Sequence, residues 1–111
     1  MSGVTTHILD TSRGRPAEGV SLRLEFRSGA GSWTAISNGV SDSGGRANLL
    51  DSAARPGTWR LTFDTAAYFD RIGVAGFYPE VQITFEVRDA EAHHHVPLLI
   101  APFGYSTYRG S

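Results

Sequence analysis

The chain has 111 residues, with 10 Lys+Arg against 11 Asp+Glu and a formal net charge of -1, and this length predicts one domain over residues 1–111. So balanced a charge gives no electrostatic basis for binding nucleic acid or an anionic membrane. The absence of cysteine excludes disulfides and thiolate metal sites.

Short stretches with strand-like patterns follow one another along most of the chain. In residues 20–27 apolar and polar side chains alternate, as in a strand with one buried face. Residues 81–87 give the clearest strand pattern of all. In chain order, we predict strands at residues 4–9, 20–27, 33–40, 47–50, 58–63, 81–87, 94–100 and 105–108.

Turn residues separate these strands, and one short helix is predicted between two of them. The breaker clusters fall at residues 14–16, 29–31, 41–45, 55–57 and 102–104. The helix is capped by Asp64 or Thr65, places Tyr68, Phe69 and Ile72 on one side, and stops at Gly73. Short strands with frequent turns predict an all-β sandwich.

The N-terminal residues suggest no targeting segment. Residues 1–7 lack a basic stretch followed by an apolar one. No apolar run reaches the roughly 20 residues needed to span a bilayer. We therefore expect a soluble cytoplasmic protein.

The four histidines are the first candidates for chemistry: His7, and three in a row at His93, His94 and His95. On a strand His93 and His95 share a face, while His94 points the other way. One hypothesis is a zinc site that uses His7, His93 and His95. A second is that the histidines only pack or lie on the surface. A third is metal-free acid–base catalysis by one histidine from the first strand and one from a late strand.

The other candidates are Arg46 and the polar C-terminus. Arg46 follows a Gly-Gly turn; it is either a solvated surface residue or a fork of donors for a flat ligand with carbonyl oxygens. Tyr108 offers a ring face and a hydroxyl, and Arg109 either joins a site or pairs with a carboxylate. Pro97 indicates a sheet edge or a bulge, and an edge is often covered by another subunit.

Four ordered motifs, together spanning nearly the whole chain, resemble the 5-hydroxyisourate hydrolases, the enzyme branch of the transthyretin-like proteins. Residues 5–11 with 14–17 are similar to the opening motif of that family, and residues 77–87 to its central strand. Residues 93–99 are similar to its histidine motif. Residues 105–111 are similar to its terminal signature, which transthyretin carriers lack.

The resemblance implies a transthyretin-like two-sheet β-sandwich with one short helix, assembled as a homotetramer (a dimer of dimers) with active sites in the channel between dimers. It implies hydrolysis of 5-hydroxyisourate to 2-oxo-4-hydroxy-4-carboxy-5-ureidoimidazoline in urate degradation, without a cofactor. The residues that match the family's catalytic histidines are His7 and His95. Those that match its substrate-binding residues are Arg46, Tyr108, Arg109, Gly110 and Ser111.

Two positions depart from the family pattern. His94 stands where the family usually has tyrosine, a mild change if the side chain faces away from the site. Gly44 stands where the family more often has aspartate, so we expect a looser turn before Arg46. The alternatives from other classes are a transthyretin-type carrier of an aromatic ligand and a zinc-binding β-sandwich. A carrier would need a more apolar channel than these residues offer.

Overall fold

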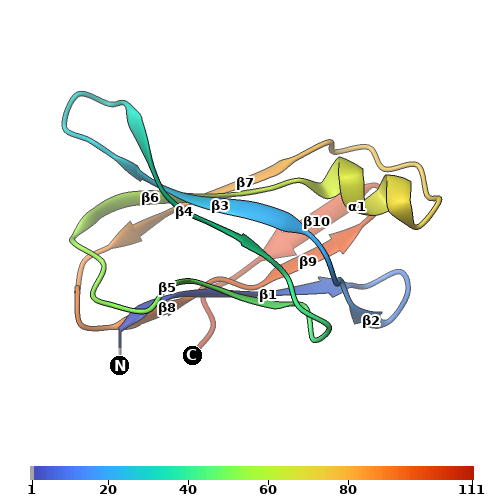
Figure 1. Cartoon of the computed structure of the whole chain (residues 1–111), viewed down its shortest axis with the longest axis horizontal. Helices are drawn as coiled ribbons and strands as arrows, with labels where there is room; N and C mark the ends of the chain where they lie inside the picture. The colour runs from blue at the N-terminus through green and yellow to red at the C-terminus, as the bar shows by residue number, and fades with distance from the viewer. Residues whose placement is uncertain (1) are drawn as a thin grey trace.

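The computed structural model describes residues 2–111, so Met1, with which the predicted domain begins, lies outside the described residues. Figure 1 shows the elements that these residues form. In chain order they are β1 (Gly3–Asp10), β2 (Arg15–Pro16), β3 (Ser21–Arg27), β4 (Trp33–Val40), β5 (Arg46–Leu50), β6 (Gly57–Phe63), α1 (Thr65–Arg71), β7 (Val81–Val87), β8 (His93–His95), β9 (Leu98–Ala101) and β10 (Gly104–Thr107). Within the described part of the chain, no helix is long and apolar enough to cross a membrane.

The strands form two layers, as Figure 1 shows. One sheet is antiparallel, in the order β4-β3-β6-β7. The other is built around β1, in the order β10-β9-β1-β2, with β5 and β8 also paired to β1. This arrangement confirms the predicted two-sheet sandwich with one short helix.

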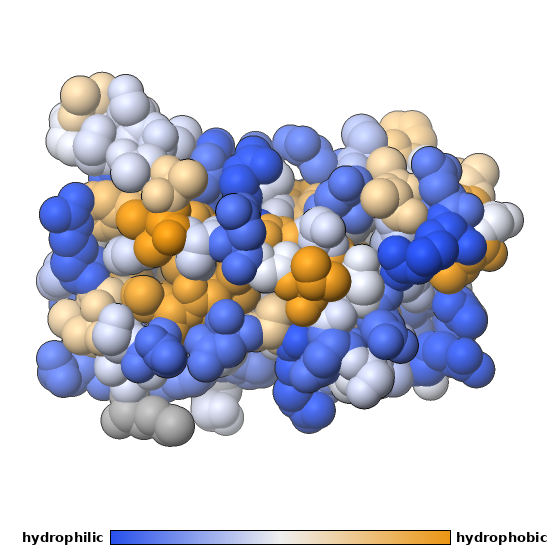
Figure 2. Space-filling view, in the orientation of Figure 1, coloured by the Kyte–Doolittle hydropathy of each residue, from blue (hydrophilic) through white to orange (hydrophobic). Residues whose placement is uncertain are grey.

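Apolar side chains from both sheets fill the space between the layers. The largest fully buried ones include Leu24, Leu61 and Phe63 from one sheet and Ile8 and Leu98 from the other. Figure 2 shows hydrophobic residues gathered in the band between the layers, with mostly hydrophilic residues below it. Burial of this apolar surface is the main favourable contribution to folding.

The single strand predicted at residues 94–100 is wrong, because the segment forms two strands, β8 and β9. Both pair with β1 in parallel, and the break lies at Val96 and Pro97. Pro97 has no N–H to donate to a ladder. The hydroxyl of Thr6 instead donates to the Val96 carbonyl at 2.6 Å, which holds the break against β1.

A second correction concerns Arg15 and Pro16, which the sequence places in a turn. They form the short strand β2, in which Pro16 pairs with Leu9 and Arg15 with Asp10. A two-residue strand has no periodicity of its own, so its pairing depends on the position of β1.

The predicted helix is confirmed, and of the two candidate caps Asp64 is the one used. Its side chain accepts from the backbone N–H of Ala67 at 3.1 Å. Gly73 follows the helix in the left-handed conformation, with φ +72°. The hydroxyl of Tyr68 donates to Asp10 at 2.7 Å, which ties the helix to the end of β1.

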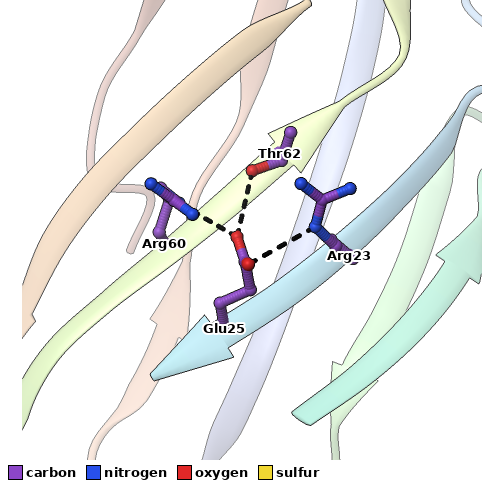
Figure 3. Close-up of polar contacts among 4 residues, drawn as sticks. All are labelled: Arg23, Glu25, Arg60 and Thr62. Atoms are coloured by element: carbon purple, nitrogen blue, oxygen red, sulfur yellow. Dashed lines mark hydrogen bonds and ion pairs between the residues drawn. The ribbon is translucent and has the colours of Figure 1, made fainter. Parts of the chain in front are cut away.

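A polar cluster lies on the outer face of the β4-β3-β6-β7 sheet, where Glu25 joins β3 to β6 (Figure 3). Glu25 accepts from Nε of Arg60 at 2.9 Å and pairs with Arg23 at 3.5 Å. The bond from Arg60 lowers the pKa of the Glu25 carboxyl. The Arg60 guanidinium also stacks over Trp33, 4.1 Å from the ring centroid. Because the four histidines lie on β1 and β8, this cluster belongs to the sheet that does not carry them.

Candidate active site

Strand β1 presents two different faces, and the candidate site lies on the outer one. Val4, Thr6 and Ile8 are buried, whereas Thr5 and His7 are half-buried. This alternation follows from the period of two in a strand. Every second residue of β1 therefore lies in the core, and the residues between them lie on the outer face of the sheet.

The neighbouring strands bring Arg46 and His95 to that same face. In the register of β1 with β5, His7 pairs with Arg46. In the register of β1 with β8, Thr5 pairs with His95. Paired residues project to the same side of a sheet, so His7, Arg46 and His95 come together from three strands that are far apart in the sequence.

Thr5 lies at the centre of a hydrogen-bonded cluster. Its Oγ1 is 2.7 Å from Nε2 of His93 and 2.9 Å from Nδ1 of His95. The rings of His93 and His95 are 6.4 Å apart between centroids. These contacts confirm that His93 and His95 share a face.

His94 points the other way, as predicted. It is 4% exposed, and its ring centroid lies 6.4 Å from that of Phe85. Burial, followed by the charge of Arg109, lowers the pKa of His94. The histidine in place of the family tyrosine thus faces the core and leaves the outer face unchanged.

Hydrogen bonds to Asp42 close the turn before Arg46, which contains Gly44. The carboxylate of Asp42 accepts from the backbone N–H groups of Gly44 and Arg46, each at 2.9 Å. Gly45 adopts φ +77°, donates to the Asp42 carbonyl at 2.9 Å and accepts from Ile8 at 2.7 Å. Asp42 thus holds the backbone of this turn through its side chain and its carbonyl, and the expected looser turn stays a prediction.

The electrostatic surroundings of His95 favour its neutral form. Burial contributes most to lowering the pKa of His95, followed by electrostatic interactions with His93, His7 and Arg46. A neutral imidazole can accept a proton at one nitrogen and donate a hydrogen bond from the other. Nε2 of His7 is buried, with no hydrogen-bond partner among residues 2–111.

The C-terminal residues pack against β8. The backbone N–H of Gly110 donates to the carbonyl of His95 at 2.8 Å, and Nη2 of Arg109 lies 3.4 Å from the carbonyl of His93. A Cβ on Gly110 would overlap the His95 ring, so only glycine allows this close approach. The tail therefore meets the edge of β8 through one bridge, between His95 and Gly110.

Two surface depressions adjoin the cluster. One includes Thr5, Arg46, Asn48 and His95 among its lining residues, and the other is lined by His93, Arg109, Gly110 and Ser111. Within the described residues, neither lining includes His7 or Tyr108. Tyr108 is 58% exposed, so its predicted contact with substrate stays a prediction.

The zinc hypothesis finds no support in the geometry. Among residues 2–111, no three His, Asp or Glu side chains are arranged to hold a metal ion. The Thr5 hydroxyl lies within hydrogen-bonding distance of both His93 and His95.

Sequence analysis missed Thr5 and gave His93 no role beyond zinc binding or packing. The signal was present, because Thr5 precedes His7 by two positions and His93 precedes His95 by two. Residues two apart on a strand share a face. What the sequence did not show is the parallel register that brings Thr5 opposite His95.

The model of the HIUase/Transthyretin family matches residues 4–110 of this chain. The 5-hydroxyisourate hydrolase of Salmonella dublin is 42% identical over 97% of this chain and 80% of its own length. The uric acid degradation bifunctional protein TTL of Arabidopsis thaliana is 44% identical over 97% of this chain, which spans only 37% of that longer protein.

Two solved structures are similar over nearly the whole chain. The Klebsiella pneumoniae 5-hydroxyisourate hydrolase has a TM-score of 0.86 at 40% identity, covering 99% of this chain and 100% of that one. Sea bream transthyretin in complex with thyroxine has a TM-score of 0.92 at 31% identity, covering 97% of this chain and 94% of that one.

The turn at Gly45 gives a prediction about stability. An alanine at Gly45 would take on a left-handed backbone and press its Cβ against the Ile8 carbonyl and Pro16. Gly73, with φ +72° and open space around it, is the matched control. We expect Gly73→Ala to lower the free energy of unfolding by about 1–2 kcal/mol and Gly45→Ala to lower it clearly more, measured by urea denaturation. Equal losses would contradict the close contact at Gly45.

The burial of His94 gives a prediction about pH. Because its pKa in the folded state lies below the ordinary 6.5, the unfolded chain binds a proton there more readily. The contribution of His94 to stability is therefore present above the unfolded pKa and is lost as pH falls towards the folded one. We expect wild type to lose stability relative to His94→Tyr as pH is lowered from about 7.5 to 5. Parallel stability curves would contradict this. His95 is present in both proteins, so its titration cancels in the difference.

Proposed function

This chain belongs to the HIUase/Transthyretin family, and we propose that it hydrolyses 5-hydroxyisourate to 2-oxo-4-hydroxy-4-carboxy-5-ureidoimidazoline in urate degradation. The proposal is supported by relatives named as 5-hydroxyisourate hydrolases at about 40% identity over nearly the full chain. The observation that carries it is the convergence of His7, Arg46 and His95 on one face of the β1 sheet.

The reaction opens a cyclic amide, which needs an activated water and a way to stabilise negative charge. His7 and His95 form the catalytic pair, since a neutral imidazole near pH 7 can accept a proton or donate a hydrogen bond. The water oxygen bonds to the ring carbonyl carbon, the C–N bond breaks, and the proton taken from water goes to the leaving nitrogen. Arg46 orients the flat substrate and stabilises the developing oxyanion with its planar fork of donors.

The C-terminal tetrapeptide completes the site. Gly110 packs against the His95 ring and Arg109 reaches the His93 carbonyl, so the tail borders the catalytic pair. Ser111 lines the same depression as His93 and offers a hydroxyl to the substrate. Tyr108 supplies a ring face and a hydroxyl once substrate is bound.

A non-catalytic carrier is the second candidate, and one observation favours it. The fold of sea bream transthyretin, solved with thyroxine, matches this one with a TM-score of 0.92. Small-molecule sites are mostly apolar, whereas His7, Arg46, Thr5 and His95 make this face polar. Fold alone does not decide function, and the polar residues favour the hydrolase.

The prediction for the active site concerns His95. Replacing His95 with alanine removes one of the two imidazoles of the catalytic pair, so we expect a loss of about 10²-fold or more in turnover. Turnover is followed as the ultraviolet signal of 5-hydroxyisourate, generated by urate oxidase. Deleting residues 109–111 in a second variant is expected to slow turnover more than it lowers stability.

The control is Glu86→Gln, a substitution at an exposed position of β7 in the β4-β3-β6-β7 sheet. This variant is expected to keep the wild-type rate. Far-ultraviolet circular dichroism checks that every variant is folded. Near-normal turnover in folded His95→Ala would remove His95 from the mechanism.

We further propose a cytoplasmic homotetramer, a dimer of dimers of a single domain over residues 1–111, with the active sites in the channel between dimers. The open, solvent-facing position of Arg46 supports a site that a second subunit would enclose. Light scattering is expected to give four times the 12.0 kDa of one chain. A monomeric mass would contradict the assembly.

A further inference from the structure

The hydroxyl of Thr5 lies between two histidines and cannot donate a hydrogen bond to both. Thr5 Oγ1 is within hydrogen-bonding distance of Nε2 of His93 and Nδ1 of His95, at 2.7 and 2.9 Å. A hydroxyl carries one hydrogen and can accept with its lone pairs. Among residues 2–111 this hydroxyl has no other hydrogen-bond partner, so its hydrogen has an acceptor only if it donates to one histidine and accepts an N–H from the other. Two directions for the chain of bonds then remain.

Each direction fixes the tautomers of both rings. If Thr5 donates to His95, then Nδ1 of His95 is an acceptor and its proton sits on Nε2, while His93 donates from its own Nε2. If Thr5 donates to His93, both neutral rings carry their proton on Nδ1. Because tautomers follow from the hydrogen-bond network, the surroundings of His93 decide between them.

The unpartnered nitrogen of His93 favours the first direction. Nδ1 of His93 is buried and has no hydrogen-bond partner among residues 2–111. In the second direction that nitrogen would be a buried N–H without an acceptor. Orphaned buried donors are rarer in proteins than under-satisfied acceptors. The first direction leaves a bare nitrogen there instead.

We propose that Thr5 is a positioning residue, which accepts from Nε2–H of His93 and donates to Nδ1 of His95, so that neutral His95 presents an N–H at Nε2. The proposal rests on the proposed hydrolase function and deepens it by dividing the work between the two histidines. His95 donates a hydrogen bond from Nε2 to the carbonyl oxygen as that oxygen gains negative charge. It keeps its proton throughout.

His7 then serves as the base. It takes the proton from the attacking water as the new C–O bond forms, and returns it to the nitrogen as the C–N bond breaks. Protons balance, because neither His93 nor Thr5 changes its proton count. Neutral histidine in the role of electrophile is a known solution in enzymes. Burial, together with the nearby charge of Arg46, lowers the pKa of His95 and so favours its neutral form.

The test measures the tautomer directly and separately from activity. In protein with nitrogen-15 histidine, two-bond proton–nitrogen spectra distinguish Nε2–H from Nδ1–H rings. The variants are Thr5→Val, which keeps the shape without the hydroxyl, and Thr5→Ser, which keeps the hydroxyl. Thr6→Val is the matched control, because it removes the neighbouring hydroxyl on the core side of the same strand.

We expect the Nε2–H form at His95 in wild type, Thr5→Ser and Thr6→Val, and a mixture of tautomers in Thr5→Val. We expect kcat to fall about 10-fold in Thr5→Val, the equivalent of one lost hydrogen bond, with KM little changed, and to recover in Thr5→Ser. An Nδ1–H ring at His95 in wild type, or an unchanged tautomer in Thr5→Val, overturns the proposal. Absence of hydrolysis by wild type would instead overturn the proposed function, and the spectra would still judge the role of Thr5.

Discussion

The pairing of β1 with β5 on one side and with β8 on the other is the constraint on which the site depends. It places Arg46 beside His7 and His95 beside Thr5. A shift of one residue in either register would turn a whole strand over and send its site residues into the core. Val4, Thr6 and Ile8 are fully packed on the inner face. Their packing in the core fixes the register of β1 with its neighbours, and that register places the site residues.

Local patterns predicted those features that depend on neighbours in the chain. These include the alternation of buried and exposed residues in β3, the helix cap at Asp64, and the opposite faces of His93 and His94. The break at Pro97 and the short strand β2 were not, because each is defined by its pairing with β1. The family resemblance pointed to His7, Arg46 and His95, whereas the role of Thr5 needed the parallel register of β8.

The similar structures include a transthyretin and a 5-hydroxyisourate hydrolase, so the fold alone does not set the function, and the candidate site of this chain lies on the outer surface of the β1 sheet. In this chain that surface carries imidazoles, a guanidinium and hydroxyls, ordered by the turn at Asp42 and bordered by the C-terminal residues. His94 lies on the inner face of β8, beside Phe85, where burial and the charge of Arg109 lower its pKa.

The most direct measurement of the central claim is the decay of 5-hydroxyisourate, formed from urate by urate oxidase, with and without the wild-type protein and in the presence and absence of a chelator. The account predicts that the protein speeds the decay equally in both conditions, because the groups that act are side chains of the chain itself. Decay at the spontaneous rate in both conditions would contradict the account and favour a carrier with the same fold.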